Sequence, residues 1–501
     1  MRLSALCLLT AGVLASCAPT PPTSAPLRSV ETYPDYRGVT IPRVVAPLNF
    51  MCVSDSVDAW AANLSAGGET LSLGGWGRKV VIDDDDWRQL LSDTTARKLD
   101  VEVFFRANGE FSRDTFSISI SDDDFDPYVT YRLIEPGYEV WNAIQIVERD
   151  MTSFATRILA DNASLDGKCM NCHIHGQQGR TTLFHLRGKG GGTMLFRNGE
   201  LRKVALRNDS MSGGAVYGEI DTSGRYGVFS TNVIIPALHS LGSRRLEVYD
   251  TESDLCIADF DKRRMILSPL VSGDSNLETF PCFAPDGRSV YFCSAPAKPL
   301  PDSLASLRYS ILRIGFDGEQ WASEVDTIWS ASREGGSASF PKVSPDGRFL
   351  LFARSANGTF PIWHRETDLK MIDLADGREV DVSPLNSPVS ETYHTWSSSG
   401  RWVVFASKRA DGQYGRVFVA HVDESGTVGR PFVIPQRDPE SDLLLLKSYN
   451  IPDVSPRPAP FDRSAVEEIC AHLFLKTEDD GHIESIGGKS DHVCIESCRK
   501  L

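Results

Sequence analysis

The sequence predicts an all-β protein: a six-bladed β-propeller, preceded by a small β-sandwich and followed by a short helical tail. Three observations lead to this fold class. A strand–turn–strand pattern centred on Gly-Arg recurs from residue 172 onward. The composition is rich in turn formers, with 40 Gly and 28 Pro but only 8 Met in 501 residues. A hydrophobic content of 41% supplies a core large enough for two or three domains.

The N-terminus has the pattern of a bacterial export signal. The apolar run over residues 3–13 is too short to span a bilayer as a stable helix. Leu-Ala-Ser-Cys follows at residues 14–17 and resembles the lipobox, where a signal peptidase cuts before the cysteine and the cysteine is acylated. We predict a signal peptide over residues 1–16 and lipidation of Cys17; a plain secretory signal cut nearby is the alternative. The proline-rich text that follows makes residues 17–29 an extended tether.

These features predict where the protein is and what it contacts. Several acyl chains hold a protein firmly on a membrane, so the lipid anchor makes the membrane a partner. Ala18 is not Asp, which favours the outer membrane, and no acidic run follows Cys17, which favours its periplasmic side. The formal charge of −15 and the lack of a basic stripe predict no nucleic-acid partner.

Residues 30–127 have the pattern of a small β-sandwich. Apolar and polar residues alternate there, as in LDVEVFFRA at 99–107. IDDDDWRQLL at 82–91 predicts a helix start, because Asp is favoured at the N-cap and in the first turn. A calcium site at these aspartates is disfavoured, since the alternating ligand spacing of a calcium loop is missing.

The repeat that predicts the propeller is an extended stretch, a tight turn ending in Gly-Arg, and a strand of β-branched and aromatic residues. CHIHGQQGRTTLF (172–184) fits this frame, and strands near 128–136 and 143–150 supply a further blade. We therefore predict a propeller over residues 128–453, closed by pairing of its first and last strands. Four more copies align without gaps: YGEIDTSGRYGVF (217–229), FPCFAPDGRSVYF (280–292), FPKVSPDGRFLLF (340–352) and YHTWSSSGRWVVF (393–405).

The tail over residues 454–501 is predicted to be partly helical and to carry cysteines. FDRSAVEEICAHLFLK has helical spacing, with Ser464 as the expected N-cap. An exported chain can form disulfides, so Cys470 is expected to pair with Cys494 or Cys498.

CMNCH, which begins at Cys169, is a CxxCH motif. In an exported protein this spacing is typical of a covalent c-type haem, in which two thiols bind the vinyl groups and the histidine binds the iron. We predict haem c attached through Cys169 and Cys172, with His173 as the proximal iron ligand. The alternatives are a disulfide between the two cysteines and a zinc site completed by His175 or His185.

The repeat frame also suggests a distal ligand. It places His173 and His394 at equivalent heights on two blades with one blade between them, so His394 is the first candidate. Two axial ligands predict electron transfer, whereas an open sixth position predicts ligand binding or peroxidase-like chemistry. Four other residues stay open as distal ligands, although each is more typical of a structural role: His175, His185, Met194 and His364.

Longer stretches of the chain resemble one protein family. They are YPDYRGVTIPRVVAPLNF (33–50), YRLIEPGYEVWN (131–142), CMNCHIHGQQGRTTLFHLRGKGGGTMLF (169–196), YHTWSSSGRWVVFASKR (393–409) and KSYNIPD (447–453). Together they are similar to the TolB-like β-propeller lipoproteins of Bacteroidetes over most of the mature chain, and the tail after residue 453 departs from the pattern. The resemblance implies a six-bladed TolB-like propeller that carries the CxxCH.

The motifs and the resemblance lead to two expectations for function. The first is a membrane-anchored envelope lipoprotein whose propeller carries haem c, for electron transfer or for redox or ligand sensing. The alternative is a propeller scaffold that binds an envelope protein partner, with the CxxCH as a disulfide or zinc site. A propeller peptidase is disfavoured, because the chain has no GxSxG motif and too few residues after the propeller for a hydrolase domain. A role without catalysis is therefore expected.

Overall fold

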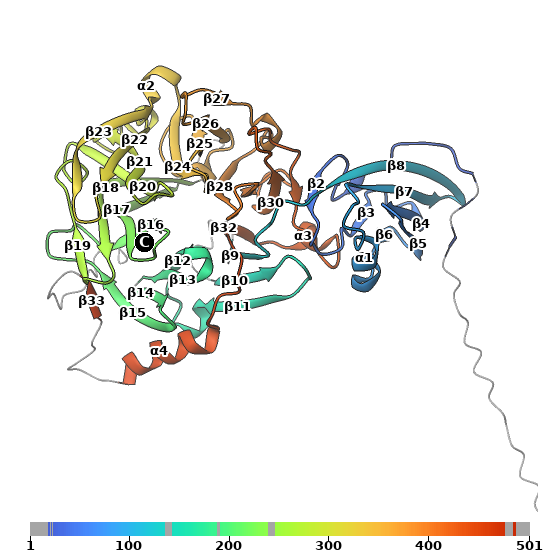
Figure 1. Ribbon diagram of the computed structural model, residues 1–501, viewed down its shortest axis with the longest axis horizontal. Helices are drawn as coiled ribbons and strands as arrows, with labels where there is room; N and C mark the ends of the chain where they lie inside the picture. Colours follow the sequence, from blue (N-terminus) through green and yellow to red (C-terminus); the bar gives the residue numbers. More distant parts are fainter. Residues whose placement is uncertain are drawn as a thin grey trace, which may run out of the picture.

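The computed structural model consists of a propeller with a smaller β-sandwich at one side (Figure 1). The predicted signal peptide, the lipidation site Cys17, and both Cys494 and Cys498 lie outside the described residues. No helix within the described ranges is long and apolar enough to cross a membrane. The structure describes residues 19–20, 22, 24–135, 143–187, 191–238, 246–475 and 484–486.

Six sheets form the blades of the propeller, which confirms the predicted fold class. In blades 2 to 6 the first strand is the inner one, beside the channel, and the chain then runs outward. Blade 2 contains β12 (Met170–Gly176), β13 (Thr181–Leu186), β14 (Gly192–Arg197) and β15 (Glu200–Leu206). Blade 3 contains β16 (Ala215–Ile220), β17 (Tyr226–Leu238), β18 (Leu246–Asp259) and β19 (Arg264–Ile266).

The remaining blades of this kind are built in the same way. Blade 4 contains β20 (Asn276–Phe283), β21 (Ser289–Pro296), β22 (Ser310–Phe316) and β23 (Trp321–Trp329). Blade 5 contains β24 (Ser337–Val343), β25 (Phe349–Ser355), β26 (Asp368–Asp373) and β27 (Glu379–Val380). Blade 6 contains β28 (Glu391–Trp396), β29 (Trp402–Ser407), β30 (Arg416–His421) and β31 (Phe432–Val433).

Blade 1 closes the ring, as predicted. Its inner strand, β32, comes from the far end of the propeller sequence and pairs antiparallel with β9, which places Asp453 opposite Thr130. This closure removes the open sheet edges that a linear array of blades would expose. Blade 1 contains β32 (Ser448–Ser455), β9 (Tyr128–Ile134), β10 (Ile144–Asp150) and β11 (Thr156–Asp161).

The Gly-Arg turn of each repeat needs its glycine. In all five copies the glycine has a positive φ: 80° at Gly179, 70° at Gly224, 68° at Gly287, 77° at Gly347 and 69° at Gly400. Glycine adopts this left-handed conformation without the steric cost that a Cβ brings. The turn therefore explains why the frame was recognisable in the sequence.

The sandwich combines a five-stranded sheet, in the order β2–β8–β7–β4–β5, with a three-stranded sheet, β1–β3–β6. Helix α1 (Asp84–Leu90) starts as predicted, because Asp83 accepts a hydrogen bond from the backbone N–H of Asp85 at 2.8 Å. The strands are β1 (Thr32–Tyr33), β2 (Thr40–Pro42), β3 (Phe50–Cys52), β4 (Val57–Ala66), β5 (Glu69–Trp76), β6 (Lys79–Val80), β7 (Lys98–Ala107) and β8 (Glu110–Ser121).

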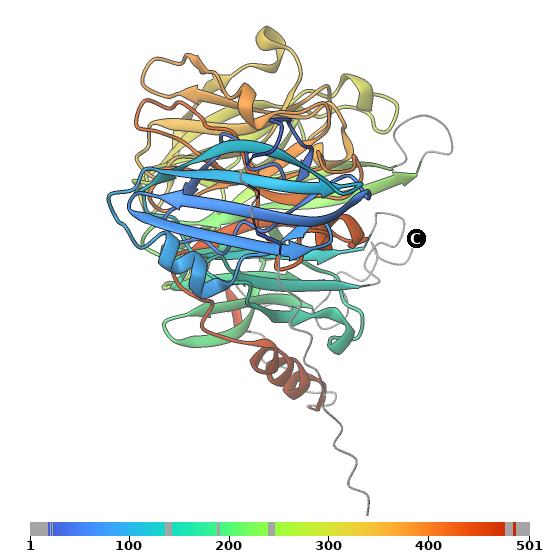
Figure 2. The same ribbon diagram turned by 90° about the vertical axis from the view of Figure 1, so that its right-hand side faces the viewer.

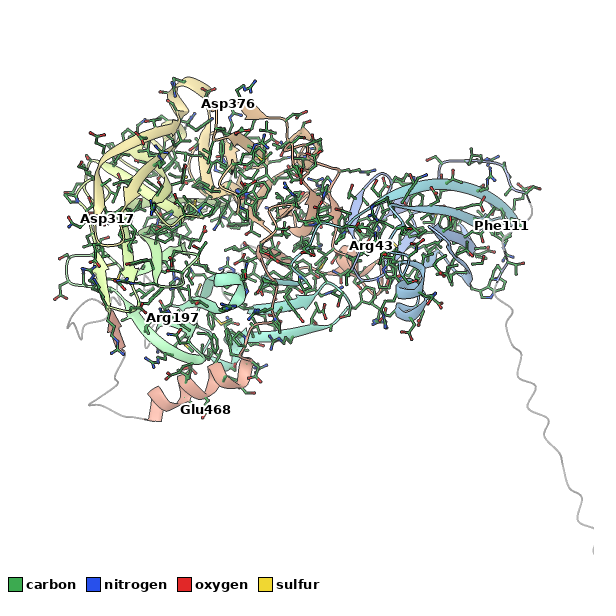
Figure 3. All side chains as sticks on the ribbon, in the orientation of Figure 1. Arg43, Phe111, Arg197, Asp317, Asp376 and Glu468 are labelled. Carbon is green, nitrogen blue, oxygen red and sulfur yellow. The ribbon has the colours of Figure 1, made fainter. Side chains whose placement is uncertain are left out.

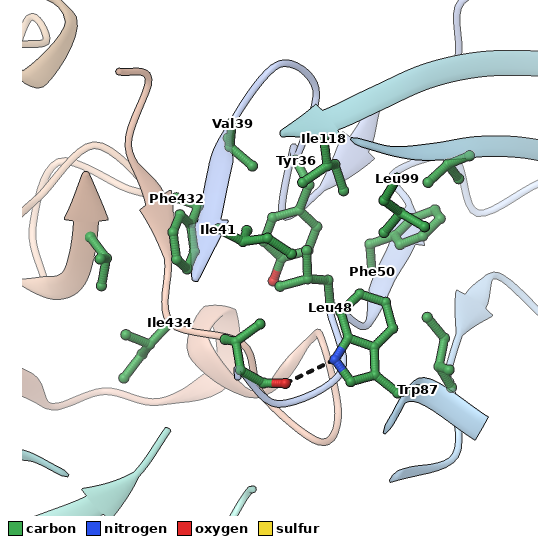
Figure 4. Packing of buried hydrophobic residues seen from close by; sticks show 14 of the residues in the cluster. Tyr36, Val39, Ile41, Leu48, Phe50, Trp87, Leu99, Ile118, Phe432 and Ile434 are labelled. Atoms are coloured by element: carbon green, nitrogen blue, oxygen red, sulfur yellow. Dashed lines mark hydrogen bonds between the residues drawn. The ribbon is translucent and has the colours of Figure 1, made fainter. Parts of the chain in front are cut away.

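The sandwich and the propeller share one hydrophobic cluster. Ile41 of the sandwich packs beside Phe432 and Ile434 of blade 6 (Figure 4). Trp87 of α1 lies in the same cluster and donates its indole N–H to the carbonyl of Val45 at 2.8 Å. Turned by 90°, the sandwich strands lie in front of the propeller (Figure 2). A continuous core therefore joins the two bodies.

The N-terminal segment joins the sandwich at its end away from the propeller. The carbonyl of Pro26 accepts from the N–H of Arg113 at 3.0 Å, and the N–H of Arg28 donates to the carbonyl of Arg113 at 2.8 Å. The neighbouring residue Phe111 marks this far end, whereas Arg43 lies toward the propeller (Figure 3). The last part of the predicted tether is therefore paired with β8.

The tail contains the predicted helix, α4 (Arg463–Leu475), but its N-cap differs from the prediction. Asp462 accepts a hydrogen bond from the backbone N–H of Ala465 at 3.1 Å, and Ser464 lies inside the helix. Asp and Ser are about equally good caps, so spacing alone could not choose between them. The other short elements are α2 (Ala331–Glu334), α3 (Ser441–Leu444) and β33 (Glu484–Ile486), which pairs with β15.

Candidate functional site

The inner strands of the propeller share a bulge around the channel. In five of these strands the register with the neighbouring strand shifts at the same place in the repeat frame, and in β16 it shifts one residue earlier. A residue other than glycine that has a positive φ has a strained backbone, and such residues concentrate at functional sites. Five of the six bulges have such a residue: Cys172 (55°), Phe280 (51°), Phe340 (53°), Tyr393 (50°) and Ile451 (51°).

Aromatic side chains from the bulges of four consecutive blades form an arc around the channel. The ring centroids are 4.9 Å apart for Tyr217 and Phe280, 4.0 Å for Phe280 and Phe340, and 5.0 Å for Phe340 and Tyr393. Phe360 of blade 5 packs edge-on against Phe280 at 5.5 Å. These contacts help to hold the strained bulges in place. We call Tyr217, Phe280, Phe340 and Tyr393 the aromatic arc.

A cavity of about 90 Å³ lies in the channel beside the aromatic arc. The space is tight at Gly218, where a Cβ would lie 1.9 Å from the carbonyl oxygen of Val228. At this place in the frame blades 2 and 6 have an imidazole, whereas the other four blades have glycine or proline. The residue that follows each bulge residue lines the cavity: His173, Gly218, Pro281, Pro341, His394 and Pro452.

His173 and His394 make equivalent contacts. Nε2 of His173 lies 3.2 Å from the carbonyl oxygen of Thr130 in blade 1, and Nε2 of His394 lies 3.1 Å from that of Leu351 in blade 5. Each carbonyl belongs to the strand that pairs with the inner strand of the preceding blade. Thr130 lies opposite Asp453, and Leu351 lies opposite Lys342. Because a carbonyl only accepts, each Nε2 carries the proton and each Nδ1 has the lone pair. Both Nδ1 atoms are buried and have no hydrogen-bond partner among the described residues.

Burial keeps both imidazoles neutral. It lowers the pKa of His173 to about 4 and the pKa of His394 to about 4. At His173 the carboxylate of Asp453 raises the pKa but does not offset burial. Near neutral pH the two rings are therefore uncharged, and each has one acceptor nitrogen that is buried and unpartnered among the described residues.

The strand that carries the CxxCH also fastens the closing strand. His175 donates its backbone N–H to Oδ2 of Asp453 at 2.9 Å, and its Nε2 lies 2.9 Å from Oγ1 of Thr130. From blade 6, Oγ1 of Thr395 donates to Oδ1 of Asp453 at 3.3 Å. Asp453 is thus bonded from both neighbouring blades. Sequence analysis assigned it no role, and its only signal was its place at the end of KSYNIPD.

A second pair that sequence analysis missed connects blades 3 and 5. Nζ of Lys342 lies 2.7 Å from Oε2 of Glu219. Burial acts to lower the pKa of Lys342, but Glu219 and Asp453 outweigh it, so the pKa is raised and the ammonium stays charged. Glu219 and Lys342 occupy the same place in the repeat frame, two residues after Tyr217 and Phe340. This shared place was the sequence signal that could have pointed to the pair.

The two cysteines of the CxxCH have different surroundings. Cys172 lines the cavity, and burial raises the pKa of its thiol to about 12. Cys169 packs against the hydrophobic cluster between blades 1 and 2, which includes Phe184 and Phe461. Cys172 forms no disulfide in the described part of the chain, so the alternative disulfide between the two cysteines is absent there.

As arranged, these residues do not fit a covalent haem. Attachment needs both thiols at one macrocycle, whereas Cys169 and Cys172 face different spaces. Nε2 of His173 donates to Thr130 and so has no lone pair for iron. The cavity of about 90 Å³ is too small to enclose a porphyrin. No haem chemistry therefore follows from this geometry.

The other predicted metal ligands have structural contacts. Met194 is fully buried in a hydrophobic cluster. Nδ1 of His185 lies 2.8 Å from Oγ1 of Thr193, and Nε2 of His364 lies 2.8 Å from Oε1 of Glu247. Within the part of the chain that the structure describes, no group of three His, Cys, Asp or Glu side chains is placed to hold a metal ion. Among the residues that the structure describes, the zinc alternative therefore has no site.

Comparisons with known proteins bear on the fold only. No protein-family model matches the chain, and no curated protein matches it. The tricorn protease is similar, with a TM-score of 0.34 and 11% identity over 81% of this chain, which spans 36% of that one. The β-propeller domain of the Trilobed protease from Pyrococcus furiosus has a TM-score of 0.32 and 8% identity over 66% of this chain and 80% of its own.

A third solved structure is similar over a comparable share of this chain. Oligogalacturonate lyase in complex with manganese has a TM-score of 0.32 and 11% identity, over 80% of this chain and 99% of its own. At these scores the identification of the propeller depends on its own strand pairing, which gives six closed blades.

Replacement of His173 tests the contact between blades 1 and 2. We expect His173→Phe to lower the free energy of unfolding by about 1–3 kcal/mol, because the Thr130 carbonyl loses its donor inside the protein. His394→Phe is expected to cost a similar amount, since its contact with Leu351 is equivalent. Urea unfolding at neutral pH measures both changes, and losses below about 0.5 kcal/mol contradict the assigned contacts.

The same variant has an expected pH dependence. Burial lowers the pKa of His173 from 6.5 to about 4, so the unfolded chain takes up a proton before the folded chain does. Wild-type stability therefore falls as pH drops from about 6.5 toward about 4, and this contribution is lost below that range. His173→Phe should lose less stability over the interval. Identical pH profiles would contradict the buried neutral state.

The poor fit of haem gives a spectroscopic prediction. We expect the full-length protein, purified from a host that attaches c-type haem, to be colourless and to lack a Soret band. The measurement is the absorbance spectrum of the denatured protein, in which covalent haem persists. A Soret band that disappears in Cys172→Ala overturns the fit described above and restores the haem prediction.

Proposed function

We propose that this protein is an envelope-anchored binding protein, in which the channel cavity of the propeller receives a small ligand. One observation carries the proposal: five strained bulge residues and two neutral histidines, from different blades, converge on one cavity. Backbone strain persists mainly where it serves a site. Ligand pockets are typically concave and apolar, with a few polar groups, as here.

The same groups favour binding over catalysis. The thiol of Cys172 stays protonated near neutral pH, because burial raises its pKa to about 12, and a protonated thiol is a poor nucleophile. Nε2 of His173 and Nε2 of His394 are each held by a main-chain carbonyl. A general base that activates a nucleophile uses such a nitrogen for that contact instead.

The proposed anchor is consistent with the position of the N-terminal segment. Pro26 and Arg28 pair with Arg113 at the end of the sandwich away from the propeller. A lipid on Cys17 would hold that end toward the membrane and leave the propeller in the aqueous space. We place the protein at the periplasmic side of the outer membrane. The competing role, a scaffold for an envelope protein partner, needs no occupied cavity.

Binding in the cavity is testable by NMR of protein labelled with ¹⁵N at the histidine side chains. We expect a screen of small polar molecules to yield a compound that shifts the Nδ1 resonances of His173 and His394. The resonance of His421, which pairs with Asp123 at 2.6 Å outside the cavity, serves as the control and should not move.

A variant of the aromatic arc completes that test. Phe340→Ala is expected to weaken binding of the same compound about three- to tenfold, because an aromatic contact is worth about 1 kcal/mol. A screen in which no compound moves either channel histidine contradicts the proposed function and favours the scaffold role.

The lipid anchor has its own test. We expect wild-type protein expressed in a bacterium that processes lipoproteins to incorporate radiolabelled palmitate and to sediment with the outer membrane. Cys17→Ser should lose the label and appear in the soluble periplasmic fraction, because it lacks the acylated thiol. Cys7→Ser, which changes a cysteine inside the predicted signal peptide, is the matched control. Wild-type protein without label contradicts the anchor.

A further inference from the structure

The N-terminal segment is seated on the five-stranded sheet of the sandwich at two points. At one edge of this sheet, Pro26 and Arg28 bond to the backbone of Arg113 in β8. At the other edge, the carbonyl oxygen of Pro19 lies against Gly74 of β5, where an added Cβ would come within 1.9 Å of that oxygen. The lack of a side chain at Gly74 therefore lets the segment approach the sheet this closely.

The two points lie on one row of the sheet. Gly74 pairs with Ala61 of β4, and Ala61 pairs with Phe104 of β7. Trp60 and Phe105, the neighbours of Ala61 and Phe104 in sequence, belong to the hydrophobic cluster of the sandwich, so the row faces away from that cluster. We call this the outer face of the sheet. Ala61 and Phe104 are nevertheless buried, as a segment seated across the row explains.

This seating limits the distance between the sandwich and the proposed lipid anchor. Cys17 stands two residues before Pro19, and two residues of chain span at most about 7 Å. Acyl chains on Cys17 would therefore begin close to the edge of the sheet at Gly74. A membrane that holds those chains lies against this end of the sandwich, with little free tether between them.

Apolar side chains stand at the same end of the outer face. Trp76 follows Gly74 by two residues, so it shares the outer face, and it is 56% exposed. Phe111 of β8 lies in the same row as Trp76, at the far end of the sandwich (Figure 3). Leu27, which is 63% exposed, forms a bridge with Arg113 at the other edge. We call Leu27, Trp76 and Phe111 the docking end. Toward the propeller the next row but one from Trp76 is polar: Ser72, Asn63, Glu102 and Thr115.

We propose that the docking end inserts into the interfacial layer of the membrane that holds Cys17. This inference rests on the lipid anchor of the proposed function and adds a second contact with the same lipid surface. Tryptophan is favoured at a membrane interface, because its ring is apolar while its indole N–H is polar. The anchor already holds the protein at the surface, so burial of a few apolar groups suffices to orient the sandwich there.

The charges nearby favour a zwitterionic lipid surface over an anionic one. The guanidinium of Arg106 lies 5.1 Å from the ring centroid of Trp76 and bonds to Asp58 at 2.8 Å, so this pair carries no net charge. The whole chain has a formal charge of −15, which an anionic surface repels. The contact is therefore apolar, and it should persist when salt screens the charges.

The test uses the full mature lipoprotein in phosphatidylcholine vesicles whose acyl chains carry bromine near the headgroup, because bromine quenches tryptophan fluorescence at short range. We expect part of the fluorescence to be quenched at low and at high salt, and Trp76→Phe to lose this quenched part. Trp321→Phe, which removes an indole from blade 4, is the matched control and should keep it. Leu27→Asp should reduce the quenching, because a charge at the docking end opposes its burial in lipid.

Three results overturn the docking: no quenching in wild type, equal quenching in wild type and Trp76→Phe, or quenching that disappears at high salt. If Leu27→Asp does not fold, the comparison of wild type with Trp76→Phe still decides. Wild-type protein that incorporates palmitate but shows no quenching leaves the anchor standing without the docking. Wild-type protein without palmitate removes both. Ligand binding in the propeller cavity is measured separately, by histidine NMR, so its outcome is distinguishable from these.

Discussion

The molecule depends on the antiparallel pairing of β32 with β9. This pairing turns a row of blades into a ring, and it places Asp453 where blades 2 and 6 both bond to it. It also supplies one wall of the cavity, through Ile451 and Pro452. The contact that closes the fold is therefore part of the candidate site. Damage to the closure is expected to affect stability and binding together.

The CxxCH strand shows how one residue can serve structure and site at once. A neutral imidazole has one donor and one acceptor nitrogen. In His173 the donor bonds to blade 1 while other atoms of the residue line the cavity, and His394 repeats this arrangement against blade 5. Proline at the same place in blades 4 and 5 has neither group. At this place in the frame the polar side chains therefore come from blades 2 and 6, whereas blade 5 supplies the charged Lys342 one residue further along its strand.

Much of the fold could be predicted because the repeat depends on the conformational preferences of neighbouring residues. The Gly-Arg turn requires a glycine with positive φ, and the strands around it alternate in a regular way. The same frame put His173 and His394 in register. The bulges were not predictable, because Phe280 and Tyr393 are residues that rarely adopt a positive φ.

The chemistry of the site was harder to predict than its position. A CxxCH is defined by spacing, and the haem prediction assumed that both thiols face one space. The bulge at Cys172 instead turns it to the channel, while Cys169 packs between blades. The contact of Lys342 with Glu219 joins residues far apart in the chain; their shared place in the repeat frame does not by itself show that they meet, and the ring geometry does.

The place of β32 in the chain has a consequence for how the protein matures. Strands β9 and β32 stand at opposite ends of the propeller sequence, so the ring cannot close until almost the whole chain is available. Pairing between such distant segments is slow, because the entropy of closing the long loop opposes it. A chain exported as proposed would complete this step after translocation. Because β32 supplies part of the cavity wall, the cavity is complete only once this last propeller strand has paired.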